Sequence, residues 1–194
     1  MAKVAGEELI LVGTGGPIQG KSDGGTLLAF NPASGALKWS FGTSGMVCST
    51  PATDGVHAFF GDDAGNFHKV ALADGKLVWK HKSKYNIRCP AAVHDEVVYF
   101  SAGDPDGGQA GQILKLDKGS GKVLWDSQCE RNNCESCWTT PTRIGDKVVL
   151  GCGLDSQQSG KLWGLNDADG TVAWKKTMEN DVQTSSPVPQ KDGT

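Results

Sequence analysis

Hydrophobic residues in this chain come in short runs separated by glycine-rich and polar stretches, and the arrangement repeats along the whole sequence. The repeat is marked by four copies of Gly-x-x-x-Trp: Gly35 to Trp39, Gly75 to Trp79, Gly121 to Trp125 and Gly170 to Trp174. One apolar run precedes each copy, at 27–30, 67–72, 113–116 and 162–165. Another lies earlier in each unit, at 9–13, 57–61, 97–103 and 148–151. Runs this short, rich in β-branched and aromatic residues and bounded by turn residues, predict β-strands rather than helices.

Each unit also carries a proline-containing segment, at Pro51, Pro90, Pro141 and Pro187. Proline cannot donate to a strand ladder and is tolerated mainly at a sheet edge, so these segments are predicted to be edge strands. A unit then has a proline strand, two apolar strands, a glycine turn and a tryptophan strand. Four strands in a period of 40 to 49 residues are typical of a β-propeller blade.

The predicted fold class is therefore all-β, a β-propeller with four blades of four antiparallel strands in a single domain, 1–194. Predicted blade bounds are 1–42, 46–82, 86–127 and 137–176, with an additional innermost strand at 182–189. The first blade is predicted to begin at its second strand, near Leu9. Either the chain closes into a small ring, or it is a slice or half of a larger one. The second reading is favoured, because a four-bladed ring would strain the packing of the repeat.

The glycine turn resembles the tryptophan-docking repeat of pyrroloquinoline-quinone-like propellers, the quinoprotein alcohol dehydrogenase-like family. The family pattern is Ala-x-Asp-x-x-Thr-Gly-x-x-x-Trp, and 116–125 matches it best. The chain departs from it in three ways. Asn31 and Asn166 take the Asp position, Ser34, Ser120 and Asp169 take the Thr position, and the second copy looks two residues shorter. The resemblance implies the fold and eight blades in a complete ring. It also implies that Trp39, Trp79, Trp125 and Trp174, with Gly35, Gly75, Gly121 and Gly170, dock neighbouring blades.

Composition and charge argue against two classes of binding partner, nucleic acids and membranes. The chain has 194 residues, 27 of them glycine, which fits many tight turns, and a net charge of −3 with both signs mixed along it. There is no basic stripe to follow phosphates, so no nucleic-acid partner is expected. No apolar run approaches the roughly 20 residues of a membrane-spanning helix, so no membrane span is expected. The sequence leaves the cellular compartment open.

The cysteines form the most suggestive candidate cluster. Cys129, Cys134 and Cys137 have C-x4-C-x2-C spacing, and a hairpin turn predicted at 145–146 would bring Cys152 near Cys137. This spacing occurs in zinc and iron–sulfur sites, although a loop disulfide or unpaired thiols fit the same residues. The favoured interpretation is that these cysteines bind no metal and that the chain binds no cofactor. Cys48 and Cys89 are expected to be small buried residues.

Three other features suggest ligand binding, but each has a simpler structural interpretation. Residues 15–22 match a P-loop, yet the following residues predict a strand where a P-loop needs a helix. Residues 104–107 have acidic residues suited to calcium but lack the Glu of an EF-hand loop. The four histidines are scattered without ligand spacing and are expected to be surface or strand residues: His57, His68, His81 and His94.

Two functions remain open from the sequence. The first is a non-catalytic propeller scaffold that binds protein partners, including further blades or a second copy of the chain, through the loops 14–25, 102–111, 127–136 and 153–160. The alternative, which the resemblance implies, is a fragment of a quinone-dependent dehydrogenase. In that family two adjacent cysteines and a calcium ion hold the cofactor, and this chain has no Cys-Cys pair.

Overall fold

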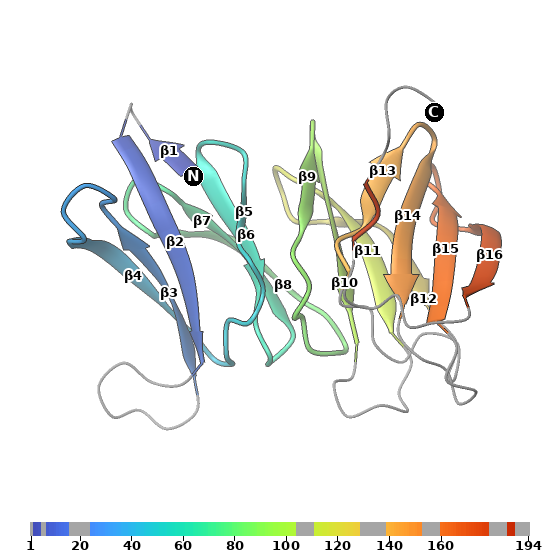
Figure 1. Cartoon of the computed structure of the whole chain (residues 1–194), viewed down its shortest axis with the longest axis horizontal. Helices are drawn as coiled ribbons and strands as arrows, with labels where there is room; N and C mark the ends of the chain where they lie inside the picture. The colour runs from blue at the N-terminus through green and yellow to red at the C-terminus, as the bar shows by residue number, and fades with distance from the viewer. Residues whose placement is uncertain are drawn as a thin grey trace. The chain divides into compact units, whose positions relative to one another are not determined.

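The computed structural model is all-β and contains four separate four-stranded sheets (Figure 1). It describes residues 2–4, 7–15, 24–103, 111–128, 139–152, 160–178 and 186–188. The first two sheets contain β1 (Ala2–Val4), β2 (Glu7–Gly15), β3 (Gly25–Phe30), β4 (Leu37–Thr43), β5 (Ala52–Thr53), β6 (His57–Gly61), β7 (Asn66–Ala71) and β8 (Leu77–Lys82). The other two contain β9 (Ala92–His94), β10 (Val97–Ala102), β11 (Gln112–Asp117), β12 (Val123–Gln128), β13 (Thr142–Ile144), β14 (Lys147–Cys152), β15 (Gly160–Asn166) and β16 (Val172–Met178).

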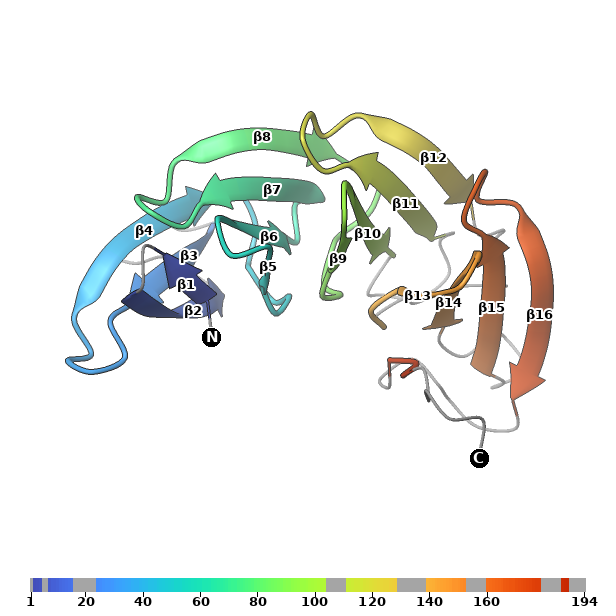
Figure 2. The ribbon, with the colours of Figure 1, turned by 90° about the horizontal axis from the view of Figure 1, so that it is seen from above.

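In each sheet the four strands pair in chain order, with the first and fourth strands at opposite edges (Figure 2). The chain divides into two compact units, Met1–Val93 and His94–Thr194. The predicted fold class is confirmed: all-β, with four antiparallel four-stranded β-propeller blades. Short first strands follow Pro51, Pro90 and Pro141 as predicted, and Ile144 pairs with Lys147 across the predicted hairpin turn.

The four turns before the fourth strands share one backbone conformation. Their glycines have φ between 68° and 72°, a left-handed region that costs glycine little. Each glycine N–H donates to the carbonyl four residues earlier, as from Gly75 to Ala71 and from Gly121 to Asp117. The second turn therefore has the same length as the others, although its sequence suggested that it was two residues shorter. Ala71 simply takes the place of the Asp or Asn that accepts hydrogen bonds in other copies.

A β-bulge follows each turn and aims the tryptophan. In the second sheet Lys69 pairs with Trp79 but Val70 pairs with Leu77, so Val78 is the extra residue. The third sheet repeats this arrangement, and Leu124 is its extra residue. A bulge bends its strand and redirects the side chains beside it, so Trp79 and Leu77 pair with adjacent residues of β7 although they are two residues apart.

Apolar side chains fill the space between sheets within the first unit. Leu9, Leu27, Ala29 and Trp39 of the first sheet cluster with Ala58, Phe60, Val70 and Leu72 of the second. All of them are at most 9% exposed. The third and fourth strands pair in the same register in both sheets: Ala29 pairs with Trp39 in the first sheet, and Lys69 pairs with Trp79 in the second.

Both ends of the chain differ from expectation. Ala2–Val4 forms β1 by pairing with residues 7–9 of β2, so the first sheet has its own first strand and does not begin at Leu9. This three-residue strand carries too little apolar pattern to be read from sequence. Residues 186–188 of the predicted strand 182–189 form no strand, and the rest of that range lies outside the described residues. Instead, the Ser186 hydroxyl accepts a hydrogen bond from the Thr140 N–H, and the Pro187 carbonyl accepts one from Thr142.

Candidate functional site

The predicted docking tryptophans are best seen at Trp39. Its ring is 9% exposed, and its Nε1–H donates to the Leu72 carbonyl of the next sheet at 2.8 Å. Gly75 lies under the ring, where an added Cβ would be only 2.6 Å from Trp39 Cε3. A glycine is therefore required twice at this position, by its φ and by the tryptophan packed against it.

Trp125 makes the same junction in the second unit. It is 7% exposed, and its Nε1–H donates to the Asp167 carbonyl at 2.9 Å. A Cβ on Gly170 would be 2.7 Å from the Trp125 ring. In both junctions the accepting carbonyl lies three residues before the turn glycine.

Charged groups reinforce the Trp125 junction. The Asp167 carboxylate accepts hydrogen bonds from Tyr99 Oη at 2.7 Å and Lys115 Nζ at 2.8 Å, and Arg143 Nε lies 3.2 Å away. Burial favours a raised Asp167 pKa, but the Lys115 and Tyr99 hydrogen bonds outweigh it and leave the pKa below its ordinary value. Burial, with Asp167 next, raises the pKa of Tyr99. The network holds a neutral tyrosine and an ionised aspartate between two sheets.

The other predicted docking residues are placed differently. Trp79 is half-buried, with its ring 6.2 Å from Phe59 and 6.1 Å from Phe67. The expectation that Trp174 is buried is wrong, because it is 40% exposed. Trp39 and Trp125 are buried by the sheet that follows each of them, and the described residues contain no sheet after the one with Trp174.

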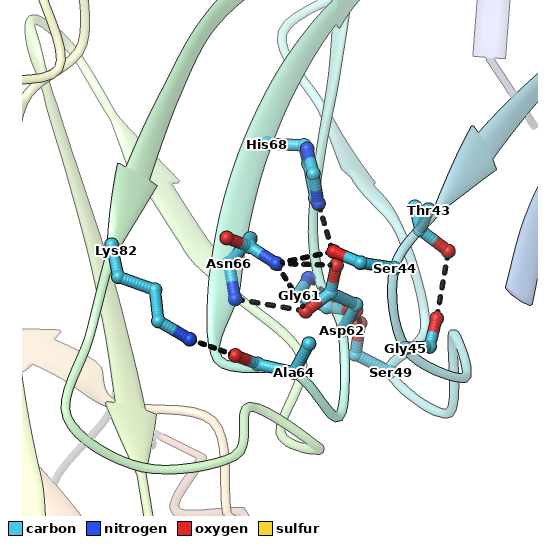
Figure 3. Close-up of polar contacts among 10 residues, drawn as sticks. All are labelled: Thr43, Ser44, Gly45, Ser49, Gly61, Asp62, Ala64, Asn66, His68 and Lys82. Carbon is cyan, nitrogen blue, oxygen red and sulfur yellow. Dashed lines mark hydrogen bonds and ion pairs between the residues drawn. The ribbon is translucent and has the colours of Figure 1, made fainter. Parts of the chain in front are cut away.

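A buried polar cluster in the second sheet was not anticipated (Figure 3). Asp62 is fully buried and accepts hydrogen bonds from Asn66 Nδ2 on both carboxylate oxygens at 3.0 Å. Its Oδ2 lies 2.9 Å from His68 Nε2. Asn66 also donates to the Ser44 hydroxyl at 3.0 Å, which connects the turn to the chain leaving the first sheet.

This cluster anchors the connections on both sides of its turn. Asp63 N–H donates to the Met46 carbonyl, and Ile87 N–H donates to the Asp62 carbonyl. Arg88 makes two bonds to Asp63, at 2.8 and 2.7 Å. The turn 62–65 therefore binds the segments before and after its own sheet, within the first unit.

The order of groups in the cluster does not suit nucleophilic catalysis. A serine nucleophile needs an imidazole beside its hydroxyl, and here Asp62 and Asn66 stand between His68 and Ser44. The His68 ring instead stacks on Phe60 at 5.1 Å, and its buried Nδ1 has no hydrogen-bond partner among the residues that the structure describes. Burial would raise the pKa of Asp62, but the His68 and Asn66 hydrogen bonds hold it below its ordinary value. Sequence reasoning missed these residues because their spacing matches no motif.

Of the remaining candidate metal-binding residues, only some lie in the part of the chain that the structure describes. Cys129, Cys134 and Cys137 lie outside the described residues, and so does the turn 104–107. Cys152 is buried in β14. In the described ranges no group of three His, Cys, Asp or Glu side chains could hold a metal ion, and no helix is long and apolar enough to cross a membrane.

Other single-residue predictions can be checked directly. Cys89 is buried as predicted, but the prediction for Cys48 is wrong because it is exposed. Val47 and Ser49 on either side are buried, whereas Cys48 between them is exposed. The four histidines lie on strands as predicted, although His68 is buried. After the P-loop-like segment, β3 begins at Gly25 as the sequence indicated. Residues 16–23 of that segment, and most of the four loops proposed for binding, lie outside the described residues.

A family model described as outer membrane protein assembly factor BamB matches residues 5–83 and 23–190. The chain belongs to this family of PQQ-like repeats. The repeat resemblance seen in the sequence is thereby confirmed.

More distant similarities agree on the fold. BamB from Moraxella catarrhalis is 16% identical with a TM-score of 0.56, over 87% of this chain and 50% of that one. The quinohemoprotein alcohol dehydrogenase from Comamonas testosteroni is 15% identical with a TM-score of 0.70, over 93% of this chain and 35% of the enzyme. The tetrathionate hydrolase of Acidithiobacillus ferrooxidans is 28% identical over 160 residues, 78% of this chain and 31% of the hydrolase. The chain therefore spans about a third of the hydrolase and half of BamB.

Proposed function

We propose that the chain is a non-catalytic β-propeller scaffold that binds a protein partner. The observation that carries this proposal is a set of exposed apolar side chains that recurs at the start of every fourth strand. We call this set the rim residues: Leu37, Leu77, Val78, Val123, Leu124 and Val172. Each is between 42% and 54% exposed.

Recurrence distinguishes the rim residues from ordinary surface hydrophobics. Single exposed apolar side chains are common on soluble proteins and need no explanation. Here they appear four times at one position of the repeat, on strands that form sheet edges. An edge strand offers unpaired backbone groups beside the apolar side chains, which is a favourable surface for another polypeptide.

The buried polar groups support a structural rather than a catalytic use of the sheets. Asp62 is bonded to Asn66 and His68, and Asp167 is bonded to Tyr99 and Lys115. These groups join turns and sheets, which is what a rigid scaffold requires. The family description also names an assembly factor, a role that depends on contacts with other proteins.

A double variant, Val78→Lys with Leu124→Lys, tests partner binding at the rim. Both residues are bulge residues with exposed side chains, so two lysines should leave the fold intact. The chain is cross-linked in extracts of its source cells, and captured proteins are quantified by mass spectrometry. We expect specific partners to fall about tenfold, which corresponds to about 1.4 kcal/mol of lost binding. The control is Thr50→Lys with Val56→Lys, two exposed positions outside the fourth strands that add the same charge.

Capture that is equal for the rim variant and its control would argue against the rim as the binding surface. The dehydrogenase alternative is tested separately. The purified chain is given pyrroloquinoline quinone and calcium, and alcohol-dependent dye reduction is measured. Saturable turnover by this chain would overturn the scaffold proposal.

A further inference from the structure

The rim residues of β8 stand beside lysines, which distinguishes this strand from the other fourth strands. Lys80 and Lys82 follow Trp79 at alternate positions of β8, and both are exposed. The equivalent positions in the other fourth strands hold Ser40 and Gly42, Asp126 and Gln128, and Lys175 and Thr177. Of the fourth strands that the structure describes, only β8 therefore has a lysine at both positions.

The charge along this edge has a single sign. The segment 76–84 contains four lysines and no aspartate or glutamate. Asp74, in the turn before β8, forms an ion pair at 2.7 Å with the first of these lysines only. Within the residues that the structure describes, Lys80 and Lys82 have no acidic partner. Lys82 Nζ donates instead to the Ala64 carbonyl (Figure 3). The lysines of β8 are therefore available to a carboxylate from another molecule.

The backbone of β8 also has an open hydrogen-bonding edge. Among the described strands β8 pairs only with β7, so alternate residues turn their N–H and C=O groups away from the sheet (Figure 2). Lys80 pairs with His68 in β7, and the next lysine, Lys82, pairs with Asn66. His68 and Asn66 are themselves bonded to the buried Asp62. The buried cluster thus holds β8 extended along the part that carries the lysines.

These features specify the chemistry of an occupant. Residues i and i+2 of a strand lie on one face about 7 Å apart, so carboxylates at alternate positions of an added strand would fall beside Lys80 and Lys82. Apolar residues of the same segment would contact Leu77 and Val78. A second copy of β8 does not fit, because lysines would lie opposite lysines, and like charges directly opposite are destabilising. Lysine on an edge strand opposes self-association and leaves the edge open to a partner of opposite charge.

We propose that β8 binds an acidic, extended segment of a protein partner as an added strand, with carboxylates at alternate positions paired to Lys80 and Lys82. This inference rests on the proposed partner binding at the rim and specifies the chemistry of the partner. β12 has the same apolar start, Val123 and Leu124, but Asp126 stands where β8 has Lys80, so β12 should repel the same segment. The rim then supplies a common apolar contact, and the residue after each tryptophan selects the partner.

The test measures binding of a fluorescein-labelled peptide of alternating valine and glutamate to the whole 194-residue chain by fluorescence anisotropy. Lys80→Glu with Lys82→Glu should raise the dissociation constant about tenfold, since two attractive pairs become repulsive. The same variant should bind a valine–lysine peptide about tenfold more tightly than wild type does, a gain that also shows the variant to be folded. The matched control is Lys38→Glu with Lys122→Glu, which changes the charge of two exposed lysines outside β8 and should leave binding unchanged.

Two further measurements test strand addition at β8. The same glutamate peptide, N-methylated at alternate residues, keeps its charge but loses backbone donors, and its affinity should fall about tenfold. Adding the unmodified peptide should slow amide hydrogen exchange in Leu77–Lys82 but not in Val123–Gln128. Equal binding of the glutamate peptide to wild type and to the Lys80→Glu, Lys82→Glu chain would overturn the proposal. So would full affinity of the N-methylated peptide.

Competition separates a polypeptide partner from other anions. A single-stranded dT oligomer and vesicles of anionic phospholipid are added at a charge equal to that of the peptide. Displacement of the peptide by either would overturn the proposal, because the lysines would then serve a polyanion or a membrane surface. The proposed partner binding fails separately, if capture from extracts is unchanged in the Val78→Lys, Leu124→Lys variant. This inference fails if capture falls in that variant but is unchanged by Lys80→Glu with Lys82→Glu.

Discussion

At the scale of single residues, the docking glycines have two separable requirements. Gly75 and Gly55 both have positive φ, but only Gly75 lies under a tryptophan ring. We expect each alanine substitution to cost about 1–2 kcal/mol from left-handed backbone strain. Gly75→Ala should cost about 1–3 kcal/mol more, because its methyl group must displace Trp39. Guanidinium unfolding followed by tryptophan fluorescence measures both variants, and equal losses would show that the ring does not constrain this glycine.

At the scale of one element, the turn 62–65 should make stability depend on acid pH. Asp62 has a lowered pKa in the folded chain, so ionised Asp62 stabilises the fold. That contribution is complete above the unfolded pKa, about 3.9 for Asp, and is lost as pH falls through the lower folded value. Asp62→Asn should therefore be less stable than wild type at pH 6 and lose less stability between pH 5 and pH 3. Unfolding free energies at several pH values measure this.

Asp167 also has a lowered pKa and contributes to the same acid range, so the slope should become smaller without disappearing. The matched control is Asp95→Asn, which removes the charge of an exposed aspartate outside the Asp62 cluster. If the unfolding free energy of the Asp62→Asn variant depends on pH as steeply as that of wild type, Asp62 does not contribute to acid stability.

At the scale of the whole molecule, docked tryptophans should carry more stability than the exposed one. Trp125→Ala empties a buried site and leaves the Asp167 carbonyl without its donor, so it should cost about 3–5 kcal/mol. Trp174→Ala should cost clearly less, provided that unfolding is measured on monomeric chain. Thermal and denaturant unfolding of the two variants at low concentration provides the comparison. A similar loss for both would mean that Trp174 is buried in the monomer.

The sequence was sufficient to predict the sheets and most of their strands. Strand pairing within a blade is local, so the apolar runs and glycine turns near 35, 75, 121 and 170 indicate where hairpins begin and end. The proline before each of β5, β9 and β13 marked a sheet edge for the same reason. Even the Gly145 hairpin register followed from turn chemistry alone.

Only the tertiary structure decided which of the repeated tryptophans dock against a neighbouring sheet. Trp39 and Trp174 have the same sequence context, yet one is 9% and the other 40% exposed, because burial depends on a neighbouring sheet rather than on the local pattern. The Asp167 network likewise joins residues far apart in the chain, such as Tyr99 with Asp167. Strand and turn are determined by interactions between near neighbours, whereas docking and buried charge are determined by what the fold brings alongside.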